Sequence, residues 1–354
     1  MKALAAWIED RVGLRPVAAF MAKKEVPCHK HTFLYYTGSS ILLFLGIQVV
    51  TGVLLALYYQ PTLAEANASV VRIMTEMPLG WLVRSVHSWS ATFMITLVFV
   101  HFLGIAFTKA YRKPREATWL TGVLLLGSSL AFGFTGYLLP WDALSLAATK
   151  VGTNLPKALP VIGPWLTQVM RAGEDVTGDT LSRFFILHVC VLPLALLAIL
   201  GIHVFLVQRH GMSVPLEAER GKIKLPALPF WPNFLFREAG VWLVLLGILL
   251  TVAVFMAPGV GPQADLMAPA PEGIKPEWYF LFMFQTLKYI PSQIWIVDGE
   301  IVGILLFAVG GILWTLVPFW DRKSSAGKRN RAVTYIGIIV VLYIIMLTLL
   351  GWIA

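Results

Sequence analysis

The sequence is poor in charged residues. Asp, Glu, Lys and Arg make up 13% of its 354 residues, about half of the roughly 25% usual in soluble domains. Hydrophobic residues make up 58%, and the remaining charge lies between long apolar stretches. This composition excludes an ordinary soluble domain. It is typical of a polytopic membrane protein, whose helices satisfy their own backbone hydrogen bonds inside lipid.

Cysteine is also scarce. Cys28 and Cys190 are too few for the disulfide framework of a small secreted domain. Cys190 lies inside an apolar run, where we expect it to be a small core residue. The first apolar run follows a charged segment of about thirty residues, so we expect no cleavable signal peptide.

Seven stretches contain no Asp, Glu, Lys or Arg, and each reaches the roughly 20 residues that span about 30 Å of hydrocarbon. We therefore predict an all-α integral membrane protein with seven transmembrane helices. The stretches are Thr32–Gln60, Ser85–Thr108, Ala117–Trp141, Phe184–Gln208, Ala239–Ala264, Ile301–Trp320 and Ala332–Ala354.

Basic residues concentrate in alternate connections. Of 28 Lys and Arg residues, 20 lie in the N-terminal arm and in the second, fourth and sixth connections. The positive-inside rule then places the N-terminus in the cytoplasm and the first, third and fifth connections outside. The net charge of +9 is thus explained by topology, and we expect no nucleic-acid binding.

Four of the seven histidines lie inside apolar stretches: His87 and His101 in the second, His188 and His203 in the fourth. A single intramembrane histidine could simply hydrogen-bond a neighbouring helix, but two matched pairs indicate a function. Fourteen residues at about 100° each fall 40° short of four turns, and fifteen residues give an offset of about 60°. Both helices run from outside to inside, so His87 is level with His188, and His101 with His203, about 21 Å further in.

Two opposed imidazoles at each level predict two six-coordinate hemes in a helical bundle. One metal ion could not be shared across the distance between the levels, and zinc would favour a closed tetrahedral shell. The first and third stretches carry glycine pairs with the same fourteen-residue interval, which would let a flat macrocycle approach the backbone. We expect Gly38 and Gly122 at the inner level and Gly52 and Gly136 at the outer level.

Three arginines lie near these levels: Arg84, Arg115 and Arg183. Each could pair with a heme propionate at the membrane edge. The alternative is that they extend to lipid headgroups.

Four segments, in this order, resemble the cytochrome b family of bc-type and chloroplast-type complexes. They are Arg84-Ser-Val-His87-Ser-Trp-Ser-Ala91, Gly133-Phe-Thr-Gly136-Tyr-Leu-Leu-Pro-Trp141, Arg183-Phe-Phe-Ile-Leu-His188 and Pro276-Glu-Trp-Tyr279. The resemblance implies an N-terminal four-helix heme-binding bundle in residues 1–210, a proline-rich cytoplasmic linker in 211–237, and three C-terminal helices in 238–354. The fifteen-residue histidine interval and Pro160-Val-Ile-Gly163 are more similar to the chloroplast type, whose two halves are separate chains but are fused here.

The resemblance implies the catalytic cytochrome b subunit of a quinol:cytochrome c oxidoreductase in a prokaryotic plasma membrane. Quinol would be oxidised at an outer site, with one electron passing to a Rieske iron–sulfur protein and then to a c-type cytochrome. The other would cross two non-covalent b-type hemes to an inner quinone-reducing site, coupled to proton translocation. A homodimer of complexes is also implied.

The same resemblance suggests Glu277 as the proton acceptor of the outer site, in a pocket shaped by Tyr279, Tyr137 and Trp141. The local sequence supports this role. Glu277 adjoins an apolar run, where burial would raise the pKa of its carboxyl and equip it to accept a proton. The alternative is a surface carboxylate near Lys275.

Two departures from the family pattern are visible. The first stretch begins without the cysteine that holds an extra heme in chloroplast-type proteins, so we expect no covalent third heme. Gln208 stands where mitochondrial-type proteins have an inner-site histidine, and Arg209, His210 and Glu238 are candidate substitutes.

Two other classes compete with this interpretation. A heme-b membrane anchor of another enzyme also uses helical histidines, but it does not predict the glycine pairs or Pro276-Glu-Trp-Tyr279. A proton-coupled transporter would be expected to show internal repeats and broken helices, and the sequence indicates neither.

Overall fold

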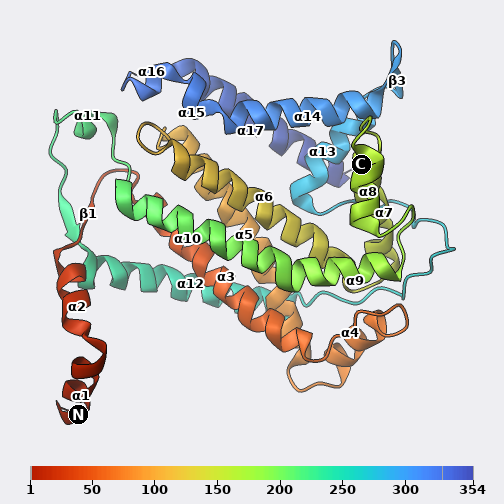
Figure 1. Cartoon of the computed structure of the whole chain (residues 1–354), viewed down its shortest axis with the longest axis horizontal. Helices are drawn as coiled ribbons and strands as arrows, with labels where there is room; N and C mark the ends of the chain where they lie inside the picture. The colour runs from red at the N-terminus through yellow and green to blue at the C-terminus, as the bar shows by residue number, and fades with distance from the viewer. Residues whose placement is uncertain (1, 329, 354) are drawn as a thin grey trace.

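The computed structural model describes residues 2–328 and 330–353, which form a bundle of long, roughly aligned helices (Figure 1). Within these residues, six helical segments are long and apolar enough to cross a membrane, and a seventh helix, α14, is apolar but has 17 residues. The prediction of an all-helical protein with seven apolar helices is confirmed. Their bounds are η1–α3 (Thr32–Leu34 and Tyr35–Ala56), α5 (Gly80–Phe107), α6 (Glu116–Leu138), α9–η2–α10 (Gly178–Ile186, Leu187–Val191 and Leu192–His210), η3–α12 (Phe230–Phe234 and Leu235–Phe255), α14 (Gly299–Thr315) and α17 (Arg331–Ile353).

The connections gather at the two ends of the bundle, which we name after one helix at each (Figure 1). The α8 end carries α4 (Ala66–Thr75), α7 (Ala143–Lys157), α8 (Gly163–Arg171), α13 (Trp278–Tyr289) and the paired strands β3 (Gln293–Ile294) and β4 (Val297–Asp298). The α11 end carries α1 (Lys2–Val12), α2 (Leu14–Lys23), α11 (Leu216–Glu219), α15 (Val317–Trp320), α16 (Arg322–Ser325) and the antiparallel pair of β1 (Glu25–Pro27) with β2 (Ala227–Pro229).

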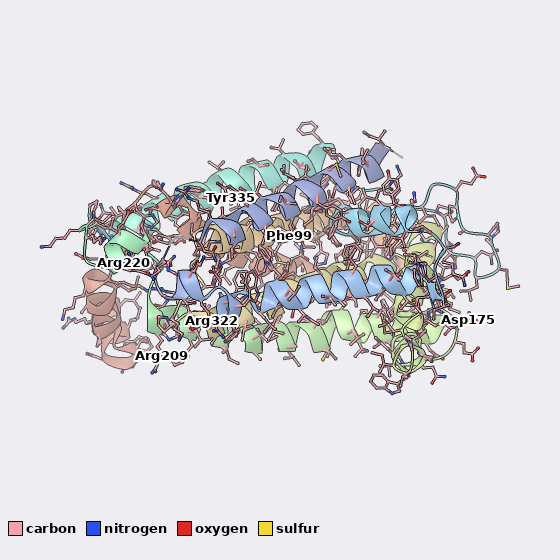
Figure 2. All side chains as sticks on the ribbon, turned by 90° about the horizontal axis from the view of Figure 1, so that it is seen from above. Phe99, Asp175, Arg209, Arg220, Arg322 and Tyr335 are labelled. Carbon is pink, nitrogen blue, oxygen red and sulfur yellow. The ribbon has the colours of Figure 1, made fainter. Side chains whose placement is uncertain are left out.

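Basic residues gather at the α11 end. Figure 2 shows Arg209, Arg220 and Arg322 together at the α11 end and Asp175 at the opposite end. A cluster of ion pairs also ties the α11 end together, because Glu219 bonds both Arg112 (2.9 Å) and Arg115 (3.0 Å).

Helices α3 and α5 pack side by side, as do α6 and α10. Phe44, Met94 and Leu249 form a buried cluster that joins α3, α5 and α12. Near the α8 end, a second cluster includes the fully buried Leu138 and Leu181. These apolar contacts fix the two helix pairs whose polar residues are described below.

The fourth spanning segment is interrupted by a π-helical turn, Leu187–Val191, that contains His188. Pro193 follows at the start of α10, and proline cannot donate the backbone hydrogen bond that an α-helix requires at that position. A π turn accommodates one extra residue. The fifteen-residue interval from His188 to His203 therefore works as a fourteen-residue one, and the rotation between these two histidines matches that between His87 and His101.

Three sequence expectations are corrected. The fifth stretch was expected to reach Ala264, but α12 ends at Phe255. Pro258 and Gly259 prevent the helix from continuing, and a search for stretches without charge does not detect them. The second helix begins at Gly80 and so includes Arg84. Cys190 is exposed on the chain surface instead of lying in a core.

Candidate functional site

Each of the four intramembrane histidines lies against one of the four glycines. A methyl group built on Gly38 or Gly122 would lie 3.5 Å from an imidazole Cε1, on Gly52 3.2 Å, and on Gly136 2.7 Å. Helix α3 thus supplies the glycines for α5, and α6 those for the η2–α10 helix. The pairs are Gly38 with His101, Gly52 with His87, Gly122 with His203, and Gly136 with His188.

A threonine precedes each glycine and hydrogen-bonds the same histidine. Sequence reasoning missed these four threonines, although the repeated dipeptide Thr-Gly was a signal that could have revealed them. The Oγ1–Nδ1 distances are 2.7 Å for Thr37–His101, 2.8 Å for Thr51–His87, 2.9 Å for Thr121–His203 and 3.1 Å for Thr135–His188.

The threonine hydroxyl determines the tautomer of each ring. Every one of these hydroxyls donates its single proton to a carbonyl of its own helix, such as Thr37 to Leu34 (2.6 Å) and Thr135 to Ala131 (2.8 Å). Its oxygen can then only accept from the histidine, so Nδ1 carries the proton. Nε2 is left with its lone pair free, which is the state that binds a metal.

The separation of the rings matches one metal between two imidazoles. The ring centroids of His87 and His188 are 6.4 Å apart. Two metal–nitrogen bonds of about 2 Å in line, plus about 1.1 Å from each nitrogen to its ring centre, give roughly 6.2 Å. His101 and His203 also lie close enough to interact electrostatically. Among the described residues, no cluster of three or more His, Cys, Asp or Glu forms a closed metal shell.

These observations fit a flat macrocycle with an axial imidazole on each side. Glycine leaves open the space that a side chain would fill beside each ring, and the two ligands of a pair come from different helix pairs, α3–α5 and α6–α10. Two imidazoles are one of the donor sets that can complete a six-coordinate heme.

The three arginines are held by backbone carbonyls. Arg84 donates to Pro258 (2.7 Å) and Gly259 (3.1 Å), which ties α5 to the loop after α12. Arg183 donates to Val169 (2.6 Å) at the end of α8. Arg115 bonds Glu219 (3.0 Å) and the carbonyls of His210 and Gly211. These contacts use part of the five N–H donors of each guanidinium.

The α8 end brings Glu277, Tyr279 and Tyr137 together. Glu277 precedes α13, and burial raises the pKa of its carboxyl. Tyr279 is buried, and a side chain on Gly133 would overlap its hydroxyl. Burial, with Glu277 and Tyr137 close by, raises the pKa of the Tyr279 hydroxyl. Lys275 is directed away, because its Nζ donates to the Trp352 carbonyl (2.8 Å).

Trp141 connects the α8 end to the loop that follows α12. Its side chain is almost fully buried, and its carbonyl accepts from the backbone N–H of Ala264 (3.0 Å). Asp142 caps α7 and bridges to Gln263. The loop after α12 is thereby attached to the start of α7, which unites residues from the N-terminal and C-terminal parts of the chain.

The inner-site candidates are more dispersed. The Gln208 amide oxygen accepts from Lys24 Nζ (2.7 Å), Arg209 is exposed, and His210 has a buried Nδ1 without a described partner. Glu238 is buried on α12 beside Tyr36. No contact among the described residues joins Glu238 to the other three.

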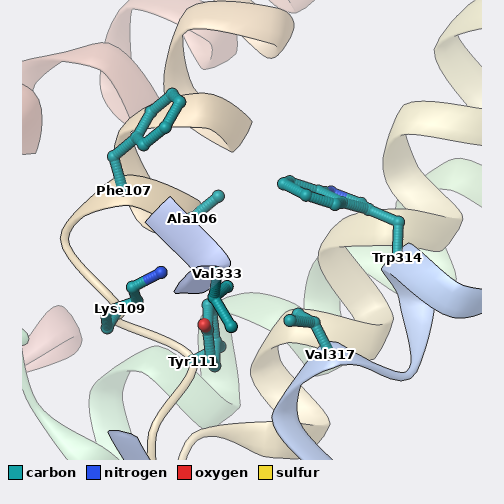
Figure 3. Close-up of a pocket in the computed structure, with 7 residues that line it drawn as sticks. All are labelled: Ala106, Phe107, Lys109, Tyr111, Trp314, Val317 and Val333. Carbon is teal, nitrogen blue, oxygen red and sulfur yellow. The ribbon is translucent and has the colours of Figure 1, made fainter. Parts of the chain in front are cut away.

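A small cavity near the α11 end does not extend this set. It is lined by residues of α5, the α5–α6 connection, α14, α15 and α17 (Figure 3). Its volume of about 10 Å³ suffices for a single water molecule, so it is not a quinone site. The lining residues are Ala106, Phe107, Lys109, Tyr111, Trp314, Val317 and Val333.

Comparison with known proteins decides the family. A family model described as Cytochrome b/b6/petB matches residues 22–211, and one described as Cytochrome b(C-terminal)/b6/petD matches residues 263–354. The chain belongs to the cytochrome b family. It is therefore a multi-pass membrane protein of a family that binds b-type heme.

Relatives support this assignment over the whole chain. The cytochrome bc complex cytochrome b subunit of Chlorobaculum thiosulfatiphilum is 43% identical over 347 residues, covering 98% of this chain and 80% of that protein. Cytochrome b6 of Synechococcus elongatus is 41% identical over 210 residues, covering 59% of this chain and 97% of that protein. A chain of a hyperthermophilic respiratory Complex III superposes with a TM-score of 0.81 at 29% identity, covering 98% of both chains. This member of the cytochrome b family is accordingly of the bc-complex type.

Proposed function

We propose that this cytochrome b is the catalytic diheme subunit of a quinol:cytochrome c oxidoreductase. Quinol is oxidised at the α8 end, and quinone is reduced at the α11 end. One of the two electrons goes to a Rieske iron–sulfur protein and on to a c-type cytochrome, and the other would reach the quinone at the α11 end through the two hemes. Protons are released where quinol is oxidised and taken up where quinone is reduced, on opposite sides of the membrane. The relative from Chlorobaculum thiosulfatiphilum, named as a bc-complex subunit, supports this proposal.

The observation that carries the proposal is the fourfold unit of threonine, glycine and histidine. His87 and His188 hold one heme, His101 and His203 hold the other, and no covalent third heme is expected. Gly38, Gly52, Gly122 and Gly136 leave room for the two macrocycles. Bound at these two levels, the non-covalent b-type hemes would supply one-electron redox chemistry between the two quinone sites.

At the outer site, Glu277 is the proton acceptor. Quinol releases two protons and two electrons on oxidation, and a carboxylate within reach of its hydroxyl takes one proton on an Oε atom. Burial raises the pKa of Glu277, which makes it a stronger base than a solvated carboxylate. Tyr279, Tyr137 and Trp141 shape the pocket and exclude water from the reacting hydroxyl.

At the inner site, we propose Gln208, Arg209, His210 and Glu238 as the residues that bind quinone. The Gln208–Lys24 bond places one amide and one ammonium together at the α11 end. We propose that Arg84, Arg115 and Arg183 bind the heme propionates. They would do so with the guanidinium N–H donors that their contacts within the protein leave free.

The domain division is part of the proposal: a four-helix heme bundle in 1–210, a linker in 211–237 and a three-helix unit in 238–354. The family models match residues up to 211 and from 263, which agrees with a division between them. We further propose a prokaryotic plasma membrane, a cytoplasmic N-terminus at the basic α11 end, and a homodimer of complexes.

Two measurements on the purified complex test this function. A reduced-minus-oxidised spectrum with pyridine hemochrome quantification should give two b-type hemes per chain. Quinol-dependent reduction of cytochrome c should be abolished by an inhibitor of the outer site. Hemes without this inhibitor-sensitive activity would point to a heme-b anchor of another enzyme, and a protein without heme would exclude the proposal.

A further inference from the structure

An apolar hairpin projects from the α8 end immediately before α14. Strands β3 and β4 pair Ile294 with Val297, and Trp295 and Ile296 form the two-residue turn. The Trp295 and Ile296 side chains are 95% and 93% exposed. Four consecutive apolar residues therefore stand outside the helix bundle, two of them almost without protein contact.

The base of the hairpin is fixed to the start of α14. The Gly299 N–H donates to the Ser292 carbonyl (2.9 Å), and a side chain on Gly299 would overlap the Pro291 carbonyl. This close approach requires glycine and leaves the hairpin little freedom to swing. Figure 1 shows the hairpin standing off from the end of α14, sideways to the direction of the spanning helices. It therefore extends along the plane of the membrane surface.

Backbone strain at the tip of the hairpin points to a functional role for Trp295. Trp295 has φ +58°, the left-handed region that the first position of such a turn normally fills with glycine. A bulky side chain there costs free energy that glycine would avoid. Strain of this kind persists where the residue serves a function.

Helix α14 lacks the length for a full span. Its 17 residues cover about 25 Å, against roughly 30 Å of hydrocarbon. Its surface is apolar, and exposed Leu305, Val309 and Ile312 lie along it. The hairpin continues this lipid-facing surface at one end, and tryptophan is enriched at the level of lipid headgroups.

We propose that the β3–β4 hairpin is a membrane-interface anchor, with Trp295 and Ile296 inserted among the headgroups and upper acyl chains of the leaflet at the α8 end. It completes the short α14 span and holds the connection between α13 and α14 at a constant depth in the membrane. This inference rests on the membrane location of the family and is independent of the proposed catalysis.

Spin labelling of the whole complex in phosphatidylcholine vesicles tests the anchor. A nitroxide is attached at Ile296→Cys and, as matched control, at Met267→Cys, a residue 91% exposed in the loop after α12. Both are made with Cys28→Ser and Cys190→Ala, and label on partner subunits is subtracted using the parent complex. Collision rates with oxygen, which enters lipid, and with a neutral nickel chelate, which stays in water, are then compared.

We expect the nickel collision rate at position 296 to be about tenfold below that at position 267, because the polar chelate is excluded from lipid, while the oxygen rate is higher. Adding Trp295→Gly should raise the nickel rate at 296. Low rates with both reagents would mean that a protein partner covers the tip, and a nickel rate equal to the control would mean that water surrounds it. Either result would overturn the proposal.

Discussion

Thr135 accepts a hydrogen bond from Nδ1 of His188 at 3.1 Å while donating its own proton to the Ala131 carbonyl at 2.8 Å. One hydroxyl therefore orients the imidazole and assigns its tautomer. The same relation recurs at Thr37, Thr51 and Thr121, so each proposed ligand has a fixed ring and a free Nε2.

Replacing this hydroxyl should weaken one heme site. In Thr135→Val the Nδ1 proton of His188 loses its acceptor, and the ring becomes a poorer electron donor. Loss of such a supporting partner typically lowers metal affinity by about 10- to 100-fold. We expect lower occupancy of the α8-end heme and a more positive midpoint potential, measured by spectroscopic redox titration. Thr135→Ser keeps the acceptor and should behave as wild type; equal effects of Val and Ser would argue against the hydrogen bond.

The four glycines should differ in their tolerance of a methyl group. Gly136→Ala places its Cβ within 2.7 Å of His188 Cε1, whereas Gly38→Ala leaves 3.5 Å to His101. A Cβ contact below 3.0 Å forces the ring to move, and an ordinary van der Waals contact does not. The heme content per chain should therefore fall most in Gly136→Ala, less in Gly52→Ala, and least in Gly38→Ala and Gly122→Ala. A uniform loss would show that the ring contacts do not decide heme retention.

The pairing of histidines across helices predicts selective loss. His203→Ala should remove the heme at the α11 end and leave the other, because His87 and His188 belong to a separate level. Low-temperature spectra that resolve the two α bands provide the measurement. If both hemes disappear to the same extent, the assignment of His203 to one level is wrong.

Much of this architecture could be predicted from charge and spacing. The absence of charge marks the seven apolar helices, and the fourteen-residue intervals place His87, His101 and the glycines on common helix faces. The ends were less predictable, because a charge-free stretch such as Ala239–Ala264 contains Pro258 and Gly259, where the helix cannot continue.

The remaining features depend on contacts between helices. Threonine in a helix usually bonds its own backbone, so nothing local marks Thr51 or Thr135 as a partner of histidine. The π turn at His188 depends on how Pro193 is accommodated. The β3–β4 hairpin was missed because a scan for long apolar runs passes over four apolar residues between Gln293 and Asp298.

Glu277 should impose a pH dependence on quinol oxidation. Burial raises the pKa of its carboxyl above the ordinary value of 4.5, and only the carboxylate can accept a proton. The turnover rate should therefore rise with pH through the raised pKa and be lost as pH falls below it. Glu277→Gln should abolish this limb and slow turnover by about 10- to 100-fold, at or below the lower end of what a positioned base contributes, since water can partly replace it. Both hemes should remain bound.

Glu277→Gln should also change the thermal stability of the protein. This effect should be favourable, whereas the effect on turnover is unfavourable. With its pKa raised, the folded state holds the Glu277 proton to higher pH than the unfolded state does, so ionisation destabilises the fold as pH rises above 4.5. Glu277→Gln should thus melt at an equal or higher temperature than wild type at pH 7, and show no gain at pH 4, where the carboxyl is protonated in both states. Slower turnover together with this stabilisation identifies a base that is kept buried at a cost to stability. Slower turnover with a lower melting temperature would instead indicate a structural role for Glu277.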